Sequence, residues 1–255
     1  MSDSITQIKG DNCLNCGETV LGNYCSNCGQ KFQPTKLPLK LFLEDAVETL
    51  FNIDNRWFKT LKDLFLKPGK VTREYIEGKR AQYLPPLRIY LSISIVYFLL
   101  VQWSESDQIF FINFSDDENS IGDLGTIIQY MVFFMVPFFA LFTKLFYRKR
   151  KAYYVEYLIL SFHIHTVWFV LLMIELFTIW LEASFEQSWV EILAIIISAP
   201  AQLATFIYIV FYLKRTFEQG WLISSAKTMG IMILYMIVLV LLIAAYTLIF
   251  TEFFK

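Results

Sequence analysis

The 255-residue sequence predicts an all-α integral membrane protein with about five transmembrane helices. Three observations support this fold class. Hydrophobic residues make up 56% of the chain and aromatic residues 18%, a balance that soluble globular domains rarely reach. After Pro85 and Pro86 the chain consists mainly of apolar runs, each long enough to cross a hydrocarbon core of about 30 Å at about 1.5 Å per residue. Finally, Lys and Arg gather on alternate connections between these runs.

The first predicted span starts directly after the double proline, which suits the first turn of a helix because that turn needs no backbone donors. Buried helices of a soluble protein are the alternative, but the runs lack the polar face that such helices need. The predicted spans cover residues 87–103, 127–147, 157–181, 190–212 and 229–251. Pro137 and Pro200 are expected to kink the second and fourth spans.

The basic residues predict the orientation of the spans, because Lys and Arg that flank a span are retained on the cytoplasmic side. With the N-terminus inside, the outer loop over residues 104–125 and the one over 182–189 carry acidic residues and neither Lys nor Arg. Residues 1–11 are polar and lack the apolar stretch of a cleavable signal peptide, so we expect the N-terminus to be retained.

All four cysteines lie in two C-x-x-C-G knuckles, which begin at Cys13 and Cys25. In such a knuckle two thiolates reach the same ion, and the glycine tolerates the positive φ that the tight turn demands. Two knuckles complete a tetrahedral site with no open position, which is typical of a structural metal site rather than a catalytic one. The predicted ligands of one structural Zn²⁺ are Cys13, Cys16, Cys25 and Cys28.

Three other interpretations of the cysteines compete with zinc. An iron site of the rubredoxin type has the same geometry and stays open. Disulfides are disfavoured because the predicted orientation places the segment in a reducing compartment, and a redox dithiol pair lacks its usual α/β context. The segment offers little apolar material beyond Leu14, Val20, Leu21 and Tyr24, so its folding free energy should come mainly from the metal.

Two amphipathic helices are predicted between the cysteine segment and the first span, one starting at Leu39 and one at Arg56. The second has an apolar stripe opposite basic residues, a pattern suited to the headgroup plane of an anionic membrane. Packing of both stripes within the protein is an equal alternative. The basic residues follow the membrane-flanking rule and need no nucleic-acid partner. The predicted headgroup contacts are Lys59, Lys62, Arg73, Lys79 and Arg80.

The same segment contains the motif PGK-x-x-REY-x-x-GKR-x-x-Y over residues 68–83. With the cysteine finger, Pro86 and the aromatic first span, it resembles a family of bacterial zinc-ribbon membrane proteins, common in Bacteroidetes, known as a domain of unknown function. The likeness covers about residues 11–100. It implies a zinc ribbon fused to a multi-pass domain in the bacterial inner membrane, and it supplies no catalytic residues. Together with the charge pattern, it predicts a cytoplasmic N-terminus and a periplasmic C-terminus.

Ionisable groups inside a span are functional-site candidates, because each costs about 2.5 to 3.5 kcal/mol at mid-helix. The candidates are His163, His165 and Glu175 in the third span and Gln202 in the fourth. Two histidines two residues apart on a helix point about 200° apart and cannot share a ligand. Interhelical hydrogen bonding is the favoured alternative, because no second acid or base completes a proton relay.

The predicted organisation is a finger over residues 1–34, a juxtamembrane segment over 35–86 and a transmembrane domain over 87–255. The leading hypothesis is a non-enzymatic adaptor or scaffold whose finger binds a protein partner. The alternative is a small transporter or channel with a polar path through spans two to four. A lipid-handling enzyme is the least supported, because the chain has neither G-x-S-x-G nor H-E-x-x-H.

Overall fold

The computed structural model describes residues 12–32, 38–49, 56–104, 124–150, 152–184 and 188–253. Most of the predicted first outer loop lies outside the described residues. The described part is helical, as the sequence predicts, with two isolated β-bridges in the finger. Its helices are α1 (Leu39–Thr49), α2 (Arg56–Leu66), α3 (Lys70–Ile76), α4 (Pro86–Ser104), α5 (Leu124–Phe134), α6 (Val136–Phe146), α7 (Tyr154–Ser184), α8 (Ser188–Phe217) and α9 (Trp221–Phe253).

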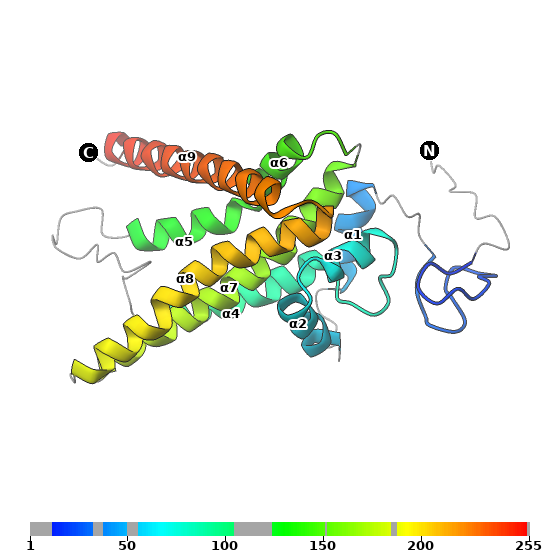
Figure 1. Ribbon diagram of the computed structural model, residues 1–255, viewed down its shortest axis with the longest axis horizontal. Coiled ribbons are helices and arrows are strands. Elements are labelled where there is room, and N and C mark those ends of the chain that lie inside the picture. The colour runs from blue at the N-terminus through cyan, green and yellow to red at the C-terminus, as the bar shows by residue number, and fades with distance from the viewer. Residues whose placement is uncertain are drawn as a thin grey trace.

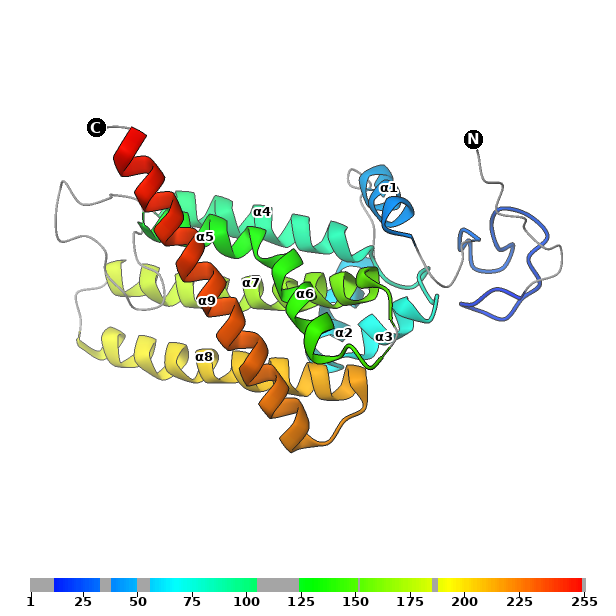
Figure 2. The same cartoon turned by 90° about the horizontal axis from the view of Figure 1, so that it is seen from above.

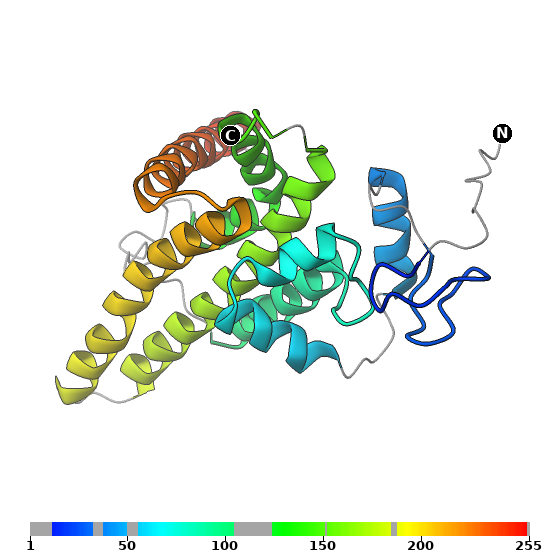
Figure 3. The same ribbon diagram turned by 45° about the vertical axis from the view of Figure 1, so that its right-hand side comes forward.

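Helices α4, α7 and α8 run side by side along the long axis of the molecule, and α7 lies between the other two (Figure 1). Helices α5 and α6 follow each other along one side of this layer, and α9 crosses obliquely over them (Figure 2). The short helices α1 to α3 and the finger gather at one end (Figure 3). The long helices therefore form a bundle with a small helical cap at one end.

Helix α7 is central because both its faces carry large apolar or aromatic side chains that pack on neighbours. Tyr90 of α4 lies 5.1 Å from Phe162 and 5.9 Å from Phe169 between ring centroids. Tyr97, two turns further along α4, lies 5.1 Å from Phe169. Tilted ring pairs at these distances are favourable beyond the area that they bury. The interface between α4 and α7 is thus formed largely by aromatic side chains.

Three helices of the described part are long and apolar enough to cross a membrane, over Pro86–Trp103, Tyr154–Leu181 and Trp221–Ile249. They correspond to the first, third and fifth predicted spans. The last of them has a mean hydropathy of 2.8 and leaves most of its side chains outside the protein core. Its exposed apolar residues include Leu222, Ile233, Leu241 and Leu248. A continuous apolar surface of this kind suits contact with lipid.

The second predicted span, over 127–147 with an expected kink at Pro137, corresponds to two helices, because α5 and α6 are separated at Met135. Pro137 supplies the physical reason. Proline has no N–H to donate to the carbonyl of Phe133 four residues earlier, and its ring crowds that carbonyl. The hydroxyl of Tyr90 donates to the freed Phe133 oxygen instead, at 2.7 Å. The break in the helix therefore becomes an attachment point for α4.

Replacing Tyr90 with Phe is expected to lower the free energy of unfolding by about 1 to 2 kcal/mol, because it leaves the Phe133 carbonyl without its donor. Denaturant titration in detergent micelles measures the change. Tyr130→Phe, at an exposed ring, is the matched control. The Tyr90 effect should shrink in a Pro137→Ala background, where an N–H is restored; an unchanged loss in that background would contradict the mechanism.

The basic residues gather at the end of the bundle that carries α1 to α3. Figure 2 shows that α4, α7 and α9 begin at this end and that α6 and α8 finish there. Within the described ranges, the Lys and Arg residues of the long helices and their connections fall in these terminal turns. They are Arg88, Lys144, Arg148, Lys149, Arg150, Lys214, Arg215 and Lys227.

Candidate metal centre and the loop that holds it

The finger consists of two copies of one turn, since each hydrogen bond of the first knuckle recurs in the second. The N–H of Gly17 donates to the Cys13 carbonyl at 2.8 Å, and the N–H of Gly29 donates to the Cys25 carbonyl at 2.9 Å. Both glycines have positive φ, of 82° and 70°. The sequence predicted this conformation, and it is the reason that a side chain is disfavoured at either position.

The four cysteine sulfurs lie within 4.8 Å of one another. The Sγ–Sγ distance is 3.6 Å between Cys13 and Cys28 and 3.5 Å between Cys16 and Cys25. A tetrahedral site with metal–sulfur bonds of about 2.3 Å places its sulfurs about 3.8 Å apart. A disulfide would require about 2.05 Å. The four cysteines therefore fit one metal ion, and zinc and iron share this geometry.

The surroundings of the Cys25 sulfur favour the thiolate form, which is the form that binds metal. The backbone N–H of Cys28 lowers the pKa of Cys25 to about 7, against the opposing effect of burial. Cys13 and Cys25 are buried, whereas Cys16 is exposed. Apart from the cysteines, only Val20 and the half-buried Phe32 form the hydrophobic cluster of the described finger. With so small a cluster, a metal ion held by the four cysteines would be the main source of folding free energy.

The side chain of Gln30 joins the finger to the turn after α3. Its Nε2 donates to the Gly78 carbonyl at 2.8 Å. Its Oε1 accepts the N–H groups of Arg80, at 3.0 Å, and Ala81, at 2.9 Å. Leu14 packs on the same turn so closely that a Cβ at Gly78 would lie 2.5 Å from its Cδ1. Gly78 has a φ of 99°, a backbone conformation that favours glycine, and a Cβ there would also displace the Leu14 side chain.

Helix α3 in turn packs against α7 and α8 of the bundle. Gly69, just before it, lies against the last turns of α8: a Cβ there would be 3.0 Å from both the Thr216 nitrogen and the Tyr212 oxygen. Thr72 is fully buried, and its hydroxyl bonds both Nδ1 of His163, at 2.7 Å, and the hydroxyl of Tyr212. The short helix thus contacts α7 and α8 through buried polar groups.

The remaining motif residues hold the turn itself together. The hydroxyl of Tyr83 donates to Glu74 at 2.6 Å, and Gln82 donates to the same carboxylate oxygen at 3.2 Å. Burial, with Glu74 beside it, raises the pKa of Tyr83 above its ordinary value. The Arg80 guanidinium lies 5.6 Å from the centroid of the Tyr75 ring. The motif that the sequence identified by resemblance is therefore a set of contacts between α3, its turn and the bundle.

Of the four predicted intramembrane residues, the three whose side chains the structure describes make separate contacts. His163 and His165 are both fully buried, but His163 faces Thr72, whereas the His165 ring lies 5.4 Å from that of Phe139. Glu175 is buried further along α7. The side chain of Gln202 lies outside the described part.

The predicted headgroup residues divide between intramolecular partners and solvent. Arg73 pairs with Glu218, Lys79 lies 3.5 Å from Glu77, and Lys59 lies over the Tyr83 ring at 5.5 Å. Lys62 is exposed. The apolar stripe of α2 is divided in the same way, since Leu64 is fully buried in the bundle and Phe58 is 84% exposed.

Replacing Gln30 with Ala is expected to release the finger from the turn without removing the metal, because three hydrogen bonds are lost and no ligand is touched. Limited proteolysis should cut the segment after the finger at least about tenfold faster, as the loss of bonds worth about 1 kcal/mol each implies. Glu18→Ala, at an exposed side chain of the same finger, is the control. Equal cleavage rates in the two variants would contradict the docking role.

The comparisons with known proteins match one segment of the chain, which includes α3 and the turn that contacts the finger. No curated protein and no solved structure is significantly similar to this chain. A family model matches a segment that starts just before α2, includes α3 and its turn, and ends within α4. The finger lies outside the match. Over residues 54–98, the chain is similar to the family described as a protein of unknown function (DUF3667).

Proposed function

We propose that this protein is a non-enzymatic membrane adaptor, in which a structural Zn²⁺ finger presents a binding surface to a protein partner. The observation that carries the proposal is the attachment of Gln30 to three backbone groups of the turn after α3. A metal site that served only its own segment would not need this attachment. Because α3 packs against α7 and α8, a partner bound to the finger would be connected to the helical bundle through the contacts of α3.

The membrane placement belongs to the same proposal. Five spans cross the bacterial inner membrane, with α5 and α6 together as the second span and α8 as the fourth. The N-terminus is cytoplasmic and the C-terminus periplasmic. Two observations support this: the exposed apolar surface of α9, and the basic residues at the end of the bundle beside the finger. At that end the exposed Lys62 and Phe58 of α2 would meet anionic headgroups. A reporter fused after Lys255 that is active only in the cytoplasm would overturn the topology.

The proposed partner surface is the side of the finger formed by Leu21 and Tyr24. These side chains are 79% and 62% exposed, although the sequence analysis counted them among the few apolar residues available to the finger. An aromatic and an aliphatic side chain on a module with so little apolar surface are suitable anchors for a protein interface. The adaptor is favoured over transport because the two intramembrane histidines make separate contacts, His163 with α3 and His165 with α6.

Co-purification from native membranes tests the adaptor. A Leu21→Asp, Tyr24→Asp double variant should keep its metal and lose the partner that the wild-type chain retains, because charge at an apolar contact opposes binding. Asn23→Asp, Asn27→Asp, which adds the same two negative charges at exposed polar side chains of the finger, should retain it. A cellular phenotype that survives the double variant but is lost in Glu175→Gln would replace the adaptor with the transport hypothesis.

A further inference from the structure

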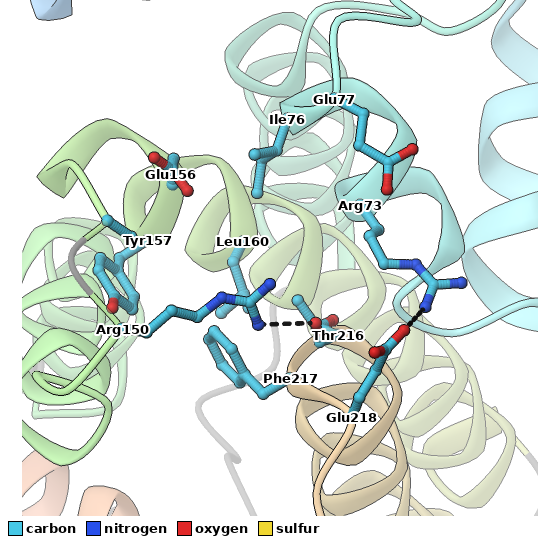
Figure 4. Close-up of a pocket in the computed structure, with 11 residues that line it drawn as sticks. Arg73, Ile76, Glu77, Arg150, Glu156, Tyr157, Leu160, Thr216, Phe217 and Glu218 are labelled. Atoms are coloured by element: carbon cyan, nitrogen blue, oxygen red, sulfur yellow. Dashed lines mark hydrogen bonds and ion pairs between the residues drawn. The ribbon is translucent and has the colours of Figure 1, made fainter. Parts of the chain in front are cut away.

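A cavity of about 220 Å³ lies between α3, the first turns of α7 and the end of α8. Its walls carry charged side chains from three separate segments (Figure 4). Arg150 enters from one side and Arg73 from the other, with Thr216 between them (Figure 4). The cavity belongs neither to the finger nor to the intramembrane residues considered above.

Most of the charges around the cavity are already paired. Arg73 forms an ion pair with Glu218, and Glu77 lies 3.5 Å from Lys79. Glu218 has a φ of 52°, at a position after a helix where glycine is usual. This uncommon conformation brings its carboxylate to Arg73 and so neutralises that arginine.

Arg150 and Glu156 are the other two charged residues that line the cavity. Their side chains form no ion pair with any residue in the described part of the chain. Arg150 is oriented by a bond from its Nη1 to the Thr216 carbonyl at 3.3 Å and by the Phe217 ring 5.3 Å away. Glu156 accepts the N–H of Tyr153 with Oε1, at 3.1 Å. The cavity thus presents one cation and one anion that do not pair with each other.

The Arg150 side chain is open to a ligand. It is exposed, and the one hydrogen bond that it forms within the described residues uses Nη1. The guanidinium has further N–H groups that can donate to a ligand in the cavity. A phosphate beside Arg150 would supply acceptors for them.

We propose that this cavity binds a phosphate ester that carries a primary ammonium group, namely a phosphoethanolamine headgroup. The phosphate lies against the Arg150 guanidinium, whose planar fork matches two phosphate oxygens. The ammonium donates to Glu156, which a quaternary choline nitrogen cannot do because it has no N–H. A simple anion would leave Glu156 uncompensated.

The position of the cavity favours a lipid headgroup over a soluble zwitterion. The candidate span of α7 starts at Tyr154, and that of α9 starts at Trp221, three residues after Glu218. The cavity therefore lies where two apolar helices leave the hydrocarbon region, which is the depth of headgroups. Only the lipid origin of the ligand rests on the membrane placement proposed above; the chemistry of the site does not depend on it or on the partner of the finger.

Soluble phosphoethanolamine tests the chemistry on the full chain in detergent micelles. It should bind at least about tenfold more tightly than inorganic phosphate or ethanolamine, because each half alone leaves one charge of the site unmatched. Arg150→Gln should weaken phosphoethanolamine about tenfold or more. Glu156→Gln should weaken phosphoethanolamine but leave phosphate unchanged. Lys149→Gln, in the same loop and with the same change of charge, is the control.

Three outcomes would overturn the assignment. Phosphate alone could bind as tightly as phosphoethanolamine, or the free amino acid alanine, a zwitterion without a phosphate, could bind more tightly than either. The third is equal binding of phosphoethanolamine by the wild type and by Arg150→Gln. Arg150→Lys, which keeps the charge and loses the fork, covers the case in which the Gln variant fails to fold, and it should weaken binding less than Gln.

Nanodiscs that contain phosphatidylethanolamine, phosphatidylcholine or phosphatidylglycerol identify the source of the ligand. Native mass spectrometry should show phosphatidylethanolamine retained by the wild type and by Lys149→Gln, and lost from Arg150→Gln. Retention of phosphatidylcholine to the same extent would overturn the role of Glu156. A failure of the topology reporter or of partner capture would leave the soluble-ligand result standing, so the two proposals fail separately.

Discussion

Replacing Cys25 with Ser is expected to abolish metal binding and to unfold the finger. Cys25 is a buried member of the four-cysteine group, its sulfur lies 3.5 Å from that of Cys16, and a serine hydroxyl is a poor substitute for a thiolate. Binding of a structural zinc ion contributes about 10 to 16 kcal/mol to such a fold at neutral pH. The small cluster around Val20 cannot offset a loss of that size.

Metal content per chain, measured by plasma mass spectrometry, should fall from one equivalent to near zero in Cys25→Ser. It should stay at one in Ser26→Ala, which changes an exposed residue of the same knuckle. The same measurement distinguishes zinc from iron in the wild-type protein. Chelation should make the finger of the wild type as sensitive to protease as that of the Cys25 variant. A full equivalent of metal in Cys25→Ser would refute the four-cysteine site.

Gly69→Ala is expected to lower the free energy of unfolding of the helical bundle by about 2 to 5 kcal/mol. One contribution is the φ of 80° at this position, which costs a residue with a Cβ about 1 to 2 kcal/mol. The other is contact, because the added Cβ would lie 2.8 Å from the Thr216 hydroxyl and 3.0 Å from the Tyr212 carbonyl. Forcing extra volume into a packed site costs about 1 to 3 kcal/mol.

Denaturant titration in micelles measures this loss, with the helical signal as the readout. Gly22→Ala is the matched control, because its added Cβ would meet nothing within 4 Å. It should change the free energy of unfolding by less than about 0.5 kcal/mol. If the two alanine variants unfold at the same denaturant concentration, α3 does not pack on α8 as described.

The features that the sequence predicted correctly depend on residues close together in the chain. The spacing of Cys13, Cys16 and Gly17 determines a knuckle by itself, because three residues of one turn carry the whole constraint. The apolar helices could be predicted for a similar reason, since length and composition alone decide whether a helix can cross a hydrocarbon core. The break at Pro137 was only partly foreseen. A kink was expected there, but its extent depends on the Tyr90 hydroxyl that stabilises it.

The features that the sequence did not predict join distant segments. Gln30 meets the turn after α3 across 48 to 51 residues, and Thr72 meets His163 across 91. A single sequence carries no local signal for such pairs. One indirect signal was present, because Gly69 and Gly78 stand at the two ends of a short helix in the motif. Glycines at fixed points of a polar motif indicate that another segment lies close to the backbone there. In the structure these neighbours are the end of α8 at Gly69 and Leu14 of the finger at Gly78.

Helix α3 has a mechanical consequence. It is one rigid element of seven residues, about 10 Å long, gripped at Gly69 by the bundle and at Gly78 by the finger. Moving the finger relative to the bundle would therefore disturb the contact at Gly69 or the one at Gly78. Thr72, on the same helix, hydrogen-bonds His163 of α7. The four-cysteine group and the interior of the bundle are thus joined by direct contacts of α3 and its turn.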